Sequence, residues 1–68
     1  MAMASIPVYI ISGGKVLFET NFNEARELVS GKSYHFIMDY GDCLVGGTNL
    51  PRRPPSDVKR IYIILPSQ

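Results

Sequence analysis

The pattern of hydrophobic and polar residues begins with two short apolar runs, residues 6–11 and 16–20. The segment Ser12-Gly13-Gly14-Lys15 separates them. β-rich runs joined by Gly-Gly predict a hairpin, because both glycines can take the positive φ that matches the twist of the strands. In that register Ile11 faces Val16, Ile10 faces Leu17 and Tyr9 faces Phe18. One predicted face then carries Tyr9, Ile11, Val16 and Phe18, and the other carries Ile6, Val8, Ile10, Leu17 and Glu19.

A helical spacing follows the hairpin and predicts one short helix, over about 21–30. Asn21 is a suitable N-cap, with Glu24 three residues later as in a capping box. Gly31 suits the left-handed conformation that ends many helices. The apolar positions form a single stripe of Phe22, Ala25, Leu28 and Val29.

Period-two alternation predicts three further strands, at about 33–39, 43–45 and 59–65. The first places Tyr34, Phe36 and Met38 opposite His35 and Ile37, and the last places Ile61, Ile63 and Leu65 opposite Tyr62 and Ile64. Residues 40–42 read as a turn. Residues 46–58 are predicted to form an irregular loop, because Pro51-Arg52-Arg53-Pro54-Pro55 cannot join a central strand. The order ββαβββ predicts an α+β fold, with the helix packed on an antiparallel sheet of four or five strands.

A chain of 68 residues makes one domain, which we expect over 6–68, with 1–5 disordered or partly left by cloning. Such a chain buries only about 60% of its unfolded surface, so its own core is marginal. Disulfides cannot assist within the chain, because Cys43 is the single cysteine. A lone thiol favours a reducing, cytoplasmic location, and no stretch predicts an export signal or a membrane helix. An apolar composition, 46% hydrophobic, instead favours a well-packed core or self-association.

Charge is unevenly distributed along the chain. Residues 1–50 carry three Lys or Arg against five Asp or Glu, whereas residues 51–68 carry four against one. The basic residues of the second part are Arg52, Arg53, Lys59 and Arg60. Arginines on a proline-stiffened loop suit carboxylate or phosphate groups, so we predict contact with an acidic protein surface; the alternative is a solvated loop. Pro51 and Pro54 have PxxP spacing, a pattern that chance often produces.

Two sets of residues raise catalytic or metal-binding chemistry. Ser12-Gly13-Gly14-Lys15 could cradle a phosphate, but a strand follows it, where a phosphate-binding loop needs a helix. His35, Asp39, Asp42 and Cys43 could form a metal or nucleophile site. His35 and Asp39 would lie about 13 Å apart along an unbent strand, too far to share an ion. We therefore expect no enzyme activity, no cofactor and no metal, with Cys43 as a small buried side chain.

A nucleic-acid interpretation rests on residues 32–37, which resemble the RNP1 strand of RNA-recognition motifs. Tyr34 and Phe36 match its base-stacking aromatic positions, and Lys32 would add a charge. Both motif glycines are replaced, by Ser33 and His35, and Asp39 stands where a further aromatic belongs. Core packing of alternating aromatics explains the same residues. Weak single-stranded nucleic-acid binding, with the basic loop, is therefore kept as an alternative function.

The sheet should present more apolar surface than one helix covers. A helix of about nine residues is ~14 Å long, whereas the sheet is ~20 Å across. We expect the uncovered patch to contain Ile6, Val8, Ile10 and Leu17 and to bind a partner or a second copy, unless loop 46–58 folds over it. The sequence thus predicts a small binding protein that occupies a surface of another macromolecule, such as a phage- or plasmid-borne regulator or inhibitor of a host complex. A structural subunit of a homo-oligomer, such as a homodimer, is the remaining alternative.

Overall fold

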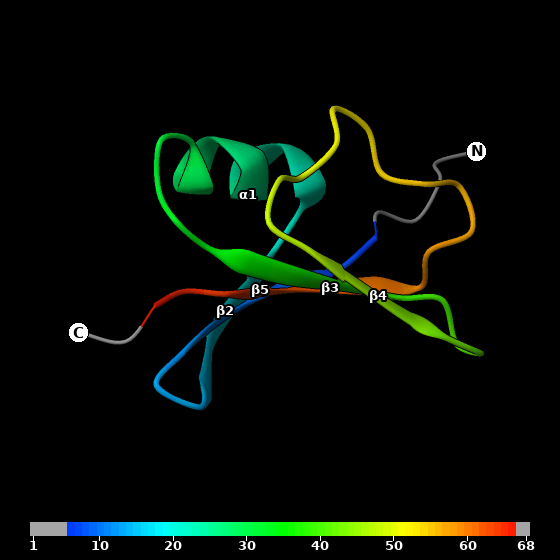
Figure 1. Ribbon diagram of the computed structural model, residues 1–68, viewed down its shortest axis with the longest axis horizontal. Helices are drawn as coiled ribbons and strands as arrows, with labels where there is room; N and C mark the ends of the chain where they lie inside the picture. The colour runs from blue at the N-terminus through cyan, green and yellow to red at the C-terminus, as the bar shows by residue number, and fades with distance from the viewer. Residues whose placement is uncertain (1–5, 67–68) are drawn as a thin grey trace.

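A computed structural model describes residues 6–66, in which one helix lies on a five-stranded sheet (Figure 1). The expectation for residues 1–5 falls outside this range. The elements are β1 (Val8–Ser12), β2 (Lys15–Thr20), α1 (Phe22–Val29), β3 (His35–Asp39), β4 (Leu44–Gly47) and β5 (Arg60–Ile64). The predicted α+β class and the order ββαβββ are confirmed.

The sheet is mixed, which corrects the expectation of a purely antiparallel one. Its strand order is β2-β1-β5-β3-β4, and β5 runs parallel to β1 and antiparallel to β3. The last strand of the chain therefore lies at the centre of the sheet. Its side chains fit that place, because β5 is apolar on both faces, as central strands usually are. Among the described residues, β2 and β4 are the edge strands.

Both long connections cross the same face of the sheet. Helix α1 carries the chain from β2 to β3, and residues 48–59 carry it from edge strand β4 back to central strand β5. Each joins strands that run in the same direction, and such a connection must cross over the sheet. Figure 1 shows α1 and the 48–59 segment on one side of the strands. The opposite side receives no connection within residues 6–66.

The hairpin register agrees with the prediction next to the turn and departs from it further on. Ile11 pairs with Val16, as predicted, but Ile10 pairs with Phe18 and Tyr9 with Glu19. A bulge at Leu17 inserts one extra residue into β2 and reverses the faces of the residues that follow it. Phe18 therefore shares a face with Ile10, and the prediction that it shares a face with Val16 is wrong.

The helix ends where its capping residues predict. The Asn21 side chain accepts a hydrogen bond of 2.8 Å from the backbone N–H of Glu24, and Gly31 takes a φ of +76°. The Glu24 carboxylate does not complete a reciprocal capping box; it accepts a 2.7 Å hydrogen bond from the Thr20 hydroxyl. These contacts fix the helix entry directly after β2. The buried helix residues are Phe22, Ala25 and Val29, three of the four positions of the predicted stripe.

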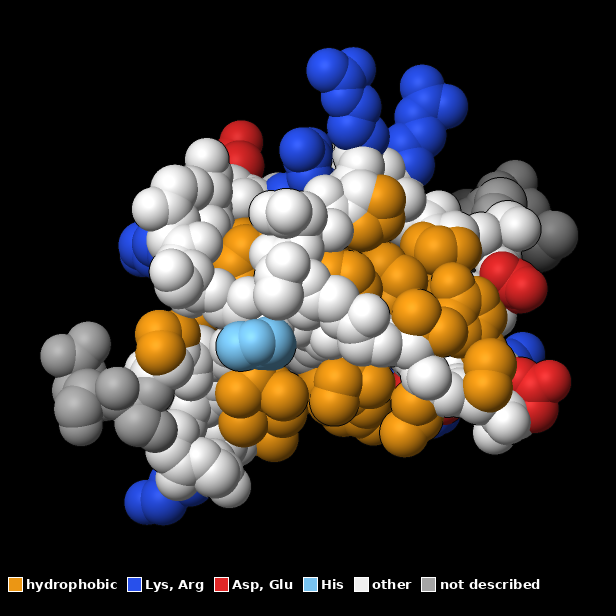
Figure 2. All heavy atoms as spheres, viewed as in Figure 1, with side chains coloured by type: hydrophobic (Ala, Val, Ile, Leu, Met, Phe, Trp, Pro, Cys, Tyr) orange, Lys and Arg blue, Asp and Glu red, His pale blue; other side chains and the backbone are white. Residues whose placement is uncertain are grey.

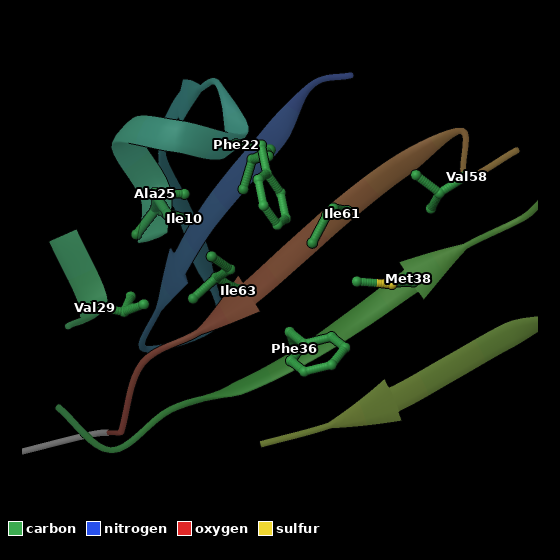
Figure 3. Packing of buried hydrophobic residues seen from close by; sticks show 10 residues of the cluster. Ile10, Phe22, Ala25, Val29, Phe36, Met38, Val58, Ile61 and Ile63 are labelled. Atoms are coloured by element: carbon green, nitrogen blue, oxygen red, sulfur yellow. The ribbon is translucent and has the colours of Figure 1, made fainter. Parts of the chain in front are cut away.

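The core lies between the sheet and the two connections (Figure 3). From the sheet it takes Val8, Ile10, Phe36, Met38, Ile61 and Ile63; from the helix Phe22, Ala25 and Val29; and from the 48–59 segment Val58. Val8 and Ile10 are fully buried, and Ile6 packs against the same cluster. The prediction that these residues form an uncovered patch is therefore wrong for Val8 and Ile10, and Ile6 is half-buried. Leu17 alone of that set is exposed, at 54%.

Gly46 and Gly47 belong to β4, which corrects their assignment to the loop. A Cβ atom on Gly47 would lie 2.6 Å from Cζ of Phe36, so the Phe36 ring occupies the space beside this glycine. Phe36 and Gly47 are direct partners in the β3–β4 ladder. Glycine thus serves close packing in this strand rather than a turn.

The two faces can be compared with a matched pair of substitutions. Val8 is fully buried on β1, whereas Val16 is 58% exposed on β2. Val8→Ala should lower the free energy of unfolding by about 2 kcal/mol, because it removes two buried carbon groups at ~0.8 kcal/mol each and leaves a cavity. Val16→Ala should cost under about 1 kcal/mol, the range of exposed strand substitutions. Urea unfolding measures both, and equal losses would contradict the assignment of the faces.

Candidate functional site

The face of the sheet away from α1 carries an apolar surface, which we call the uncovered face. Its apolar members are Tyr9 and Ile11 of β1, Val16 of β2, Ile37 of β3, Leu44 of β4, and Tyr62 and Ile64 of β5, as the strand pairings place them. Most are half-buried by their neighbours, whereas Val16 and Leu44 are 58% and 66% exposed. Figure 2 shows hydrophobic side chains along the lower margin of the molecule, on this side of the sheet. Contiguous apolar surface of this kind is uncommon on small soluble domains and makes this face the candidate site.

Two tyrosines occupy the middle of the uncovered face. Tyr9 and Tyr62 are direct partners on the parallel strands β1 and β5, and their rings stack with centroids 5.6 Å apart and planes inclined by 24°. Aromatic rings add large contact area with few rotatable bonds, which suits a binding surface. Ile37 continues this row on β3, opposite Tyr62. The centre of the face is therefore rigid and amphipathic.

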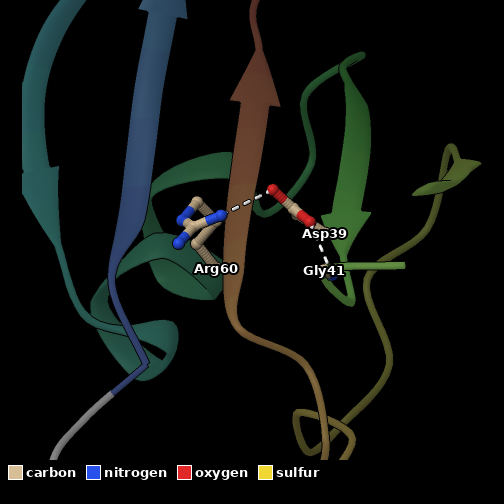
Figure 4. A network of polar contacts seen from close by, with 3 residues as sticks. All are labelled: Asp39, Gly41 and Arg60. Carbon is tan, nitrogen blue, oxygen red and sulfur yellow. Dashed lines mark hydrogen bonds and ion pairs between the residues drawn. The ribbon is translucent and has the colours of Figure 1, made fainter. Parts of the chain in front are cut away.

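An ion pair lies at one end of the same face (Figure 4). Nη1 of Arg60 donates a 2.7 Å hydrogen bond to the Asp39 carboxylate, whose other oxygen accepts a 2.8 Å hydrogen bond from the backbone N–H of Gly41. The Gly41 N–H, and after it Arg60, hold the pKa of Asp39 below its ordinary value of 3.8. The same pairing raises the pKa of Arg60. Both charges are thus held in place and largely cancel each other.

The four predicted basic residues do not form one surface. Arg52 and Arg53 are exposed on the 48–59 segment, on the helix side of the molecule, where Figure 2 shows basic side chains projecting. Arg60 lies on the opposite face, paired with Asp39. Lys59 lines a shallow hollow of about 460 Å³ together with Tyr40, Asp42, Cys43, Val45 and Asp57. Carboxylate groups thus lie near Lys59 and Arg60. Of the four predicted residues, Arg52 and Arg53 have the exposed basic side chains that were predicted for the loop.

Of the residues considered for catalysis or metal binding, Asp39 and Asp42 lie near Cys43, whereas His35 lies apart from them. His35 and Asp39 stand at opposite ends of β3, and no group of three or more His, Cys, Asp or Glu residues within 6–66 is placed to hold a metal ion. Cys43 is exposed, so the expectation of a buried side chain is wrong. Atoms packed around its sulfur remove enough water to raise the pKa of the thiol, and Asp42 raises it further. A thiol with a raised pKa is a poor nucleophile at neutral pH.

The aromatic residues of the nucleic-acid alternative belong to the core. Phe36 is 7% exposed, and Tyr34 packs against the same cluster. The Tyr34 hydroxyl accepts a 2.7 Å hydrogen bond from the backbone N–H of Leu50, which ties the 48–59 segment to the sheet. The buried Phe36 ring cannot stack on a base without disrupting this packing, whereas Tyr34 is half-buried and borders a surface hollow. Lys32 is exposed beyond the helix and lines one surface hollow together with Tyr34 and Arg26.

Sequence reasoning missed Tyr9 and Tyr62 as members of one site. Both alternate with buried valine or isoleucine residues in their strands, and that alternation did place Tyr62 opposite Ile61 and Ile63. Their pairing depends on β5 lying beside β1, two elements separated by most of the chain. The available signal was the apolar character of both faces of 61–64, which indicates a central strand.

The ion pair gives a pH-dependent prediction. Because folding lowers the pKa of Asp39, its ionised form stabilises the fold fully above about pH 4, and this stabilisation is lost as pH falls through the lowered pKa. Arg60→Gln should raise the pKa of Asp39 toward 3.8 without reaching it, because the Gly41 N–H remains. Carbon-13 NMR titration of the carboxyl group measures this. Arg52→Gln is the control and should leave the value unchanged; an unchanged value in Arg60→Gln would refute the pairing.

Comparisons with known proteins do not indicate a function for this chain. No family model matches the chain, and neither a curated protein nor a solved structure shows significant similarity to it. No helix within residues 6–66 is long and apolar enough to cross a membrane. The functional conclusion therefore depends on the uncovered face, the basic segment and the two sheet edges.

Proposed function

We propose that this chain is a non-enzymatic binding protein that places the uncovered face of its sheet against an apolar surface of another protein. One observation carries the proposal: both long connections cross one face, and the other face presents an apolar row centred on the Tyr9–Tyr62 stack. Burying apolar area is the main favourable contribution to most protein association. A face that residues 6–66 leave open is available for that purpose.

Charge favours a protein rather than a nucleic acid as the partner. The uncovered face carries the basic residues Arg60 and His35 and the acidic residues Asp39 and Glu19. Strong non-specific nucleic-acid sites neutralise about 6–10 phosphates, and no such array borders the tyrosines. The aromatic stack alone would suit bases, but the nearest arginine is already bound to a carboxylate.

The separation of His35 from Cys43 and its acidic neighbours, and the raised pKa of Cys43, support a binding role over catalysis. A nucleophile needs an adjacent base and an orienting group, and His35 lies at the far end of β3 from Asp39. We extend the proposal to a cytoplasmic location, because an exposed single thiol such as Cys43 stays reduced there.

The segment with Arg52 and Arg53 lies on the helix side, so one flat partner cannot contact both it and the uncovered face. This separation makes the two surfaces distinguishable by mutation. Tyr62→Lys introduces a charge at the centre of the uncovered face, while its long aliphatic stem still covers the neighbours. Arg52→Glu combined with Arg53→Glu reverses the charge of the segment and leaves the sheet unchanged.

We expect Tyr62→Lys to weaken partner binding at least about tenfold, equivalent to ~1.4 kcal/mol, and the double arginine variant to bind as the wild type does. The immobilised protein would capture partners from lysate, mass spectrometry would identify them, and binding to the purified partner would be measured for each variant. Circular dichroism and urea unfolding control for folding. Loss only in the arginine variant would contradict the proposal and favour the basic segment.

The same variants separate the nucleic-acid alternative. Wild-type protein should not shift single-stranded oligonucleotides at low salt, about 50 mM, where phosphate contacts are strongest. A shift that weakens steeply with added salt and disappears in Tyr62→Lys would instead assign the uncovered face to nucleic acid.

A further inference from the structure

The two edges of the sheet differ in how they are protected against pairing with another strand. Edge strands in soluble proteins are guarded by charges, prolines and bulges. Strand β2 has a bulge at Leu17 and charged residues at Lys15 and Glu19. Strand β4 contains only Leu44, Val45, Gly46 and Gly47, in an unbroken register with β3. The β4 edge is therefore open for strand addition, and the β2 edge is blocked.

The backbone groups that β4 directs outward can be assigned from the β3–β4 hairpin. The N–H of Tyr40 donates a 2.9 Å hydrogen bond to the carbonyl of Cys43, which makes these two residues a hydrogen-bonded pair. Such pairs alternate along an antiparallel ladder, so Val45 and Gly47 are bonded to β3. Leu44 and Gly46 then direct their N–H and C=O groups away from the sheet.

We propose that two copies of this chain pair through β4, antiparallel, about a two-fold axis that passes through Val45 perpendicular to the sheet. Leu44 of each copy then lies opposite Gly46 of the other, and the outward groups of both residues form four reciprocal hydrogen bonds. Val45 meets its own counterpart at a non-hydrogen-bonded position, where Cα atoms are about 4.5 Å apart. The large Leu44 side chain faces a glycine, so the opposed side chains do not crowd each other.

The occupant is assigned as a second copy because this register sets Leu44 of each chain against Gly46 of the other, so that the two strands fit each other reciprocally. Opposed residues in an antiparallel pair must lie on the same face, and a two-fold axis through a residue position satisfies this requirement for every pair. The assembly stops at two copies, because each remaining outer edge is a guarded β2. Figure 1 shows β4 as the strand nearest the viewer, and Figure 2 shows apolar side chains over that region of the molecule.

Pairing through β4 places both uncovered faces on the same side of one continuous sheet. A single uncovered face spans about 400 Å², estimated from the spacing of five strands and the rise per residue. Two faces give about 800 Å², the area that one partner contributes to a standard protein interface. The inference depends on the edge geometry alone and stands whether or not the uncovered face binds as proposed. The edge contact itself is small, so we expect a weak dimer in the micromolar range or above.

A disulfide test captures even a weak dimer. In a Cys43→Ser background, Val45→Cys should form an intermolecular disulfide under mild oxidation at least about tenfold faster than Val16→Cys, because opposed residues lie within the ~4.4–6.8 Å that a disulfide spans. Val16 is the matched control, since it is an exposed valine on the blocked edge, at 58% against 47% for Val45. Non-reducing electrophoresis measures both rates. Equal rates would overturn the proposal.

Sedimentation equilibrium tests the native association. The apparent mass of the wild type should rise toward twice the monomer mass with concentration, and Val45→Lys should remain monomeric, because two lysines would then oppose each other. Val16→Lys should still associate, and urea unfolding controls for folding. A dimer that persists in Val45→Lys but is lost in Tyr62→Lys would place the second copy on the uncovered face. A strictly monomeric wild type would show that the β4 edge does not pair with a second copy. Each of these two results would overturn the proposal.

Discussion

The position of β5 between β1 and β3 is the constraint on which the rest of the structure depends. A C-terminal strand at the centre of the sheet forces the chain to leave the edge at β4 and cross back through residues 48–59. Helix α1 makes the other crossing, and both lie on the same side. The covered face becomes the core and the opposite face stays open. The uncovered apolar face is thus a direct consequence of the topology.

The core is small, but its central side chains are fully buried and its buried polar atoms are hydrogen-bonded. Val8, Ile10, Ile61 and Ile63 are fully buried at the two central strands, and no buried side-chain polar atom within residues 6–66 lacks a hydrogen-bond partner. The 48–59 segment contributes Val58 to the packing and is tied down by the hydrogen bond from the Leu50 N–H to the Tyr34 hydroxyl. A single short helix can therefore suffice, because an irregular segment covers the part of the sheet that the helix does not reach.

Local features of this fold were predictable from the sequence, and the non-local ones were not. Asn21 and Gly31 act through backbone groups a few residues away, so the helix ends could be predicted closely. The alternation of residues 35–38 and 61–64 separated the two faces of each strand for the same reason. The bulge at Leu17 and the pairing of β1 with β5 depend on contacts between distant segments, and a one-residue shift reverses every later side chain in a strand. The uncovered face was therefore predicted to exist but was assigned to the wrong residues.

The isoleucine methyl groups test the central claim, that the α1 side of the sheet is closed and the other side is open. Ile10, Ile61 and Ile63 point into the core, whereas Ile11, Ile37 and Ile64 lie on the uncovered face. A soluble paramagnetic agent broadens the NMR signals of methyl groups that it can approach. The account predicts strong broadening for Ile11, Ile37 and Ile64 and protection for Ile10, Ile61 and Ile63. Equal protection of all six, or the reverse pattern, would contradict it.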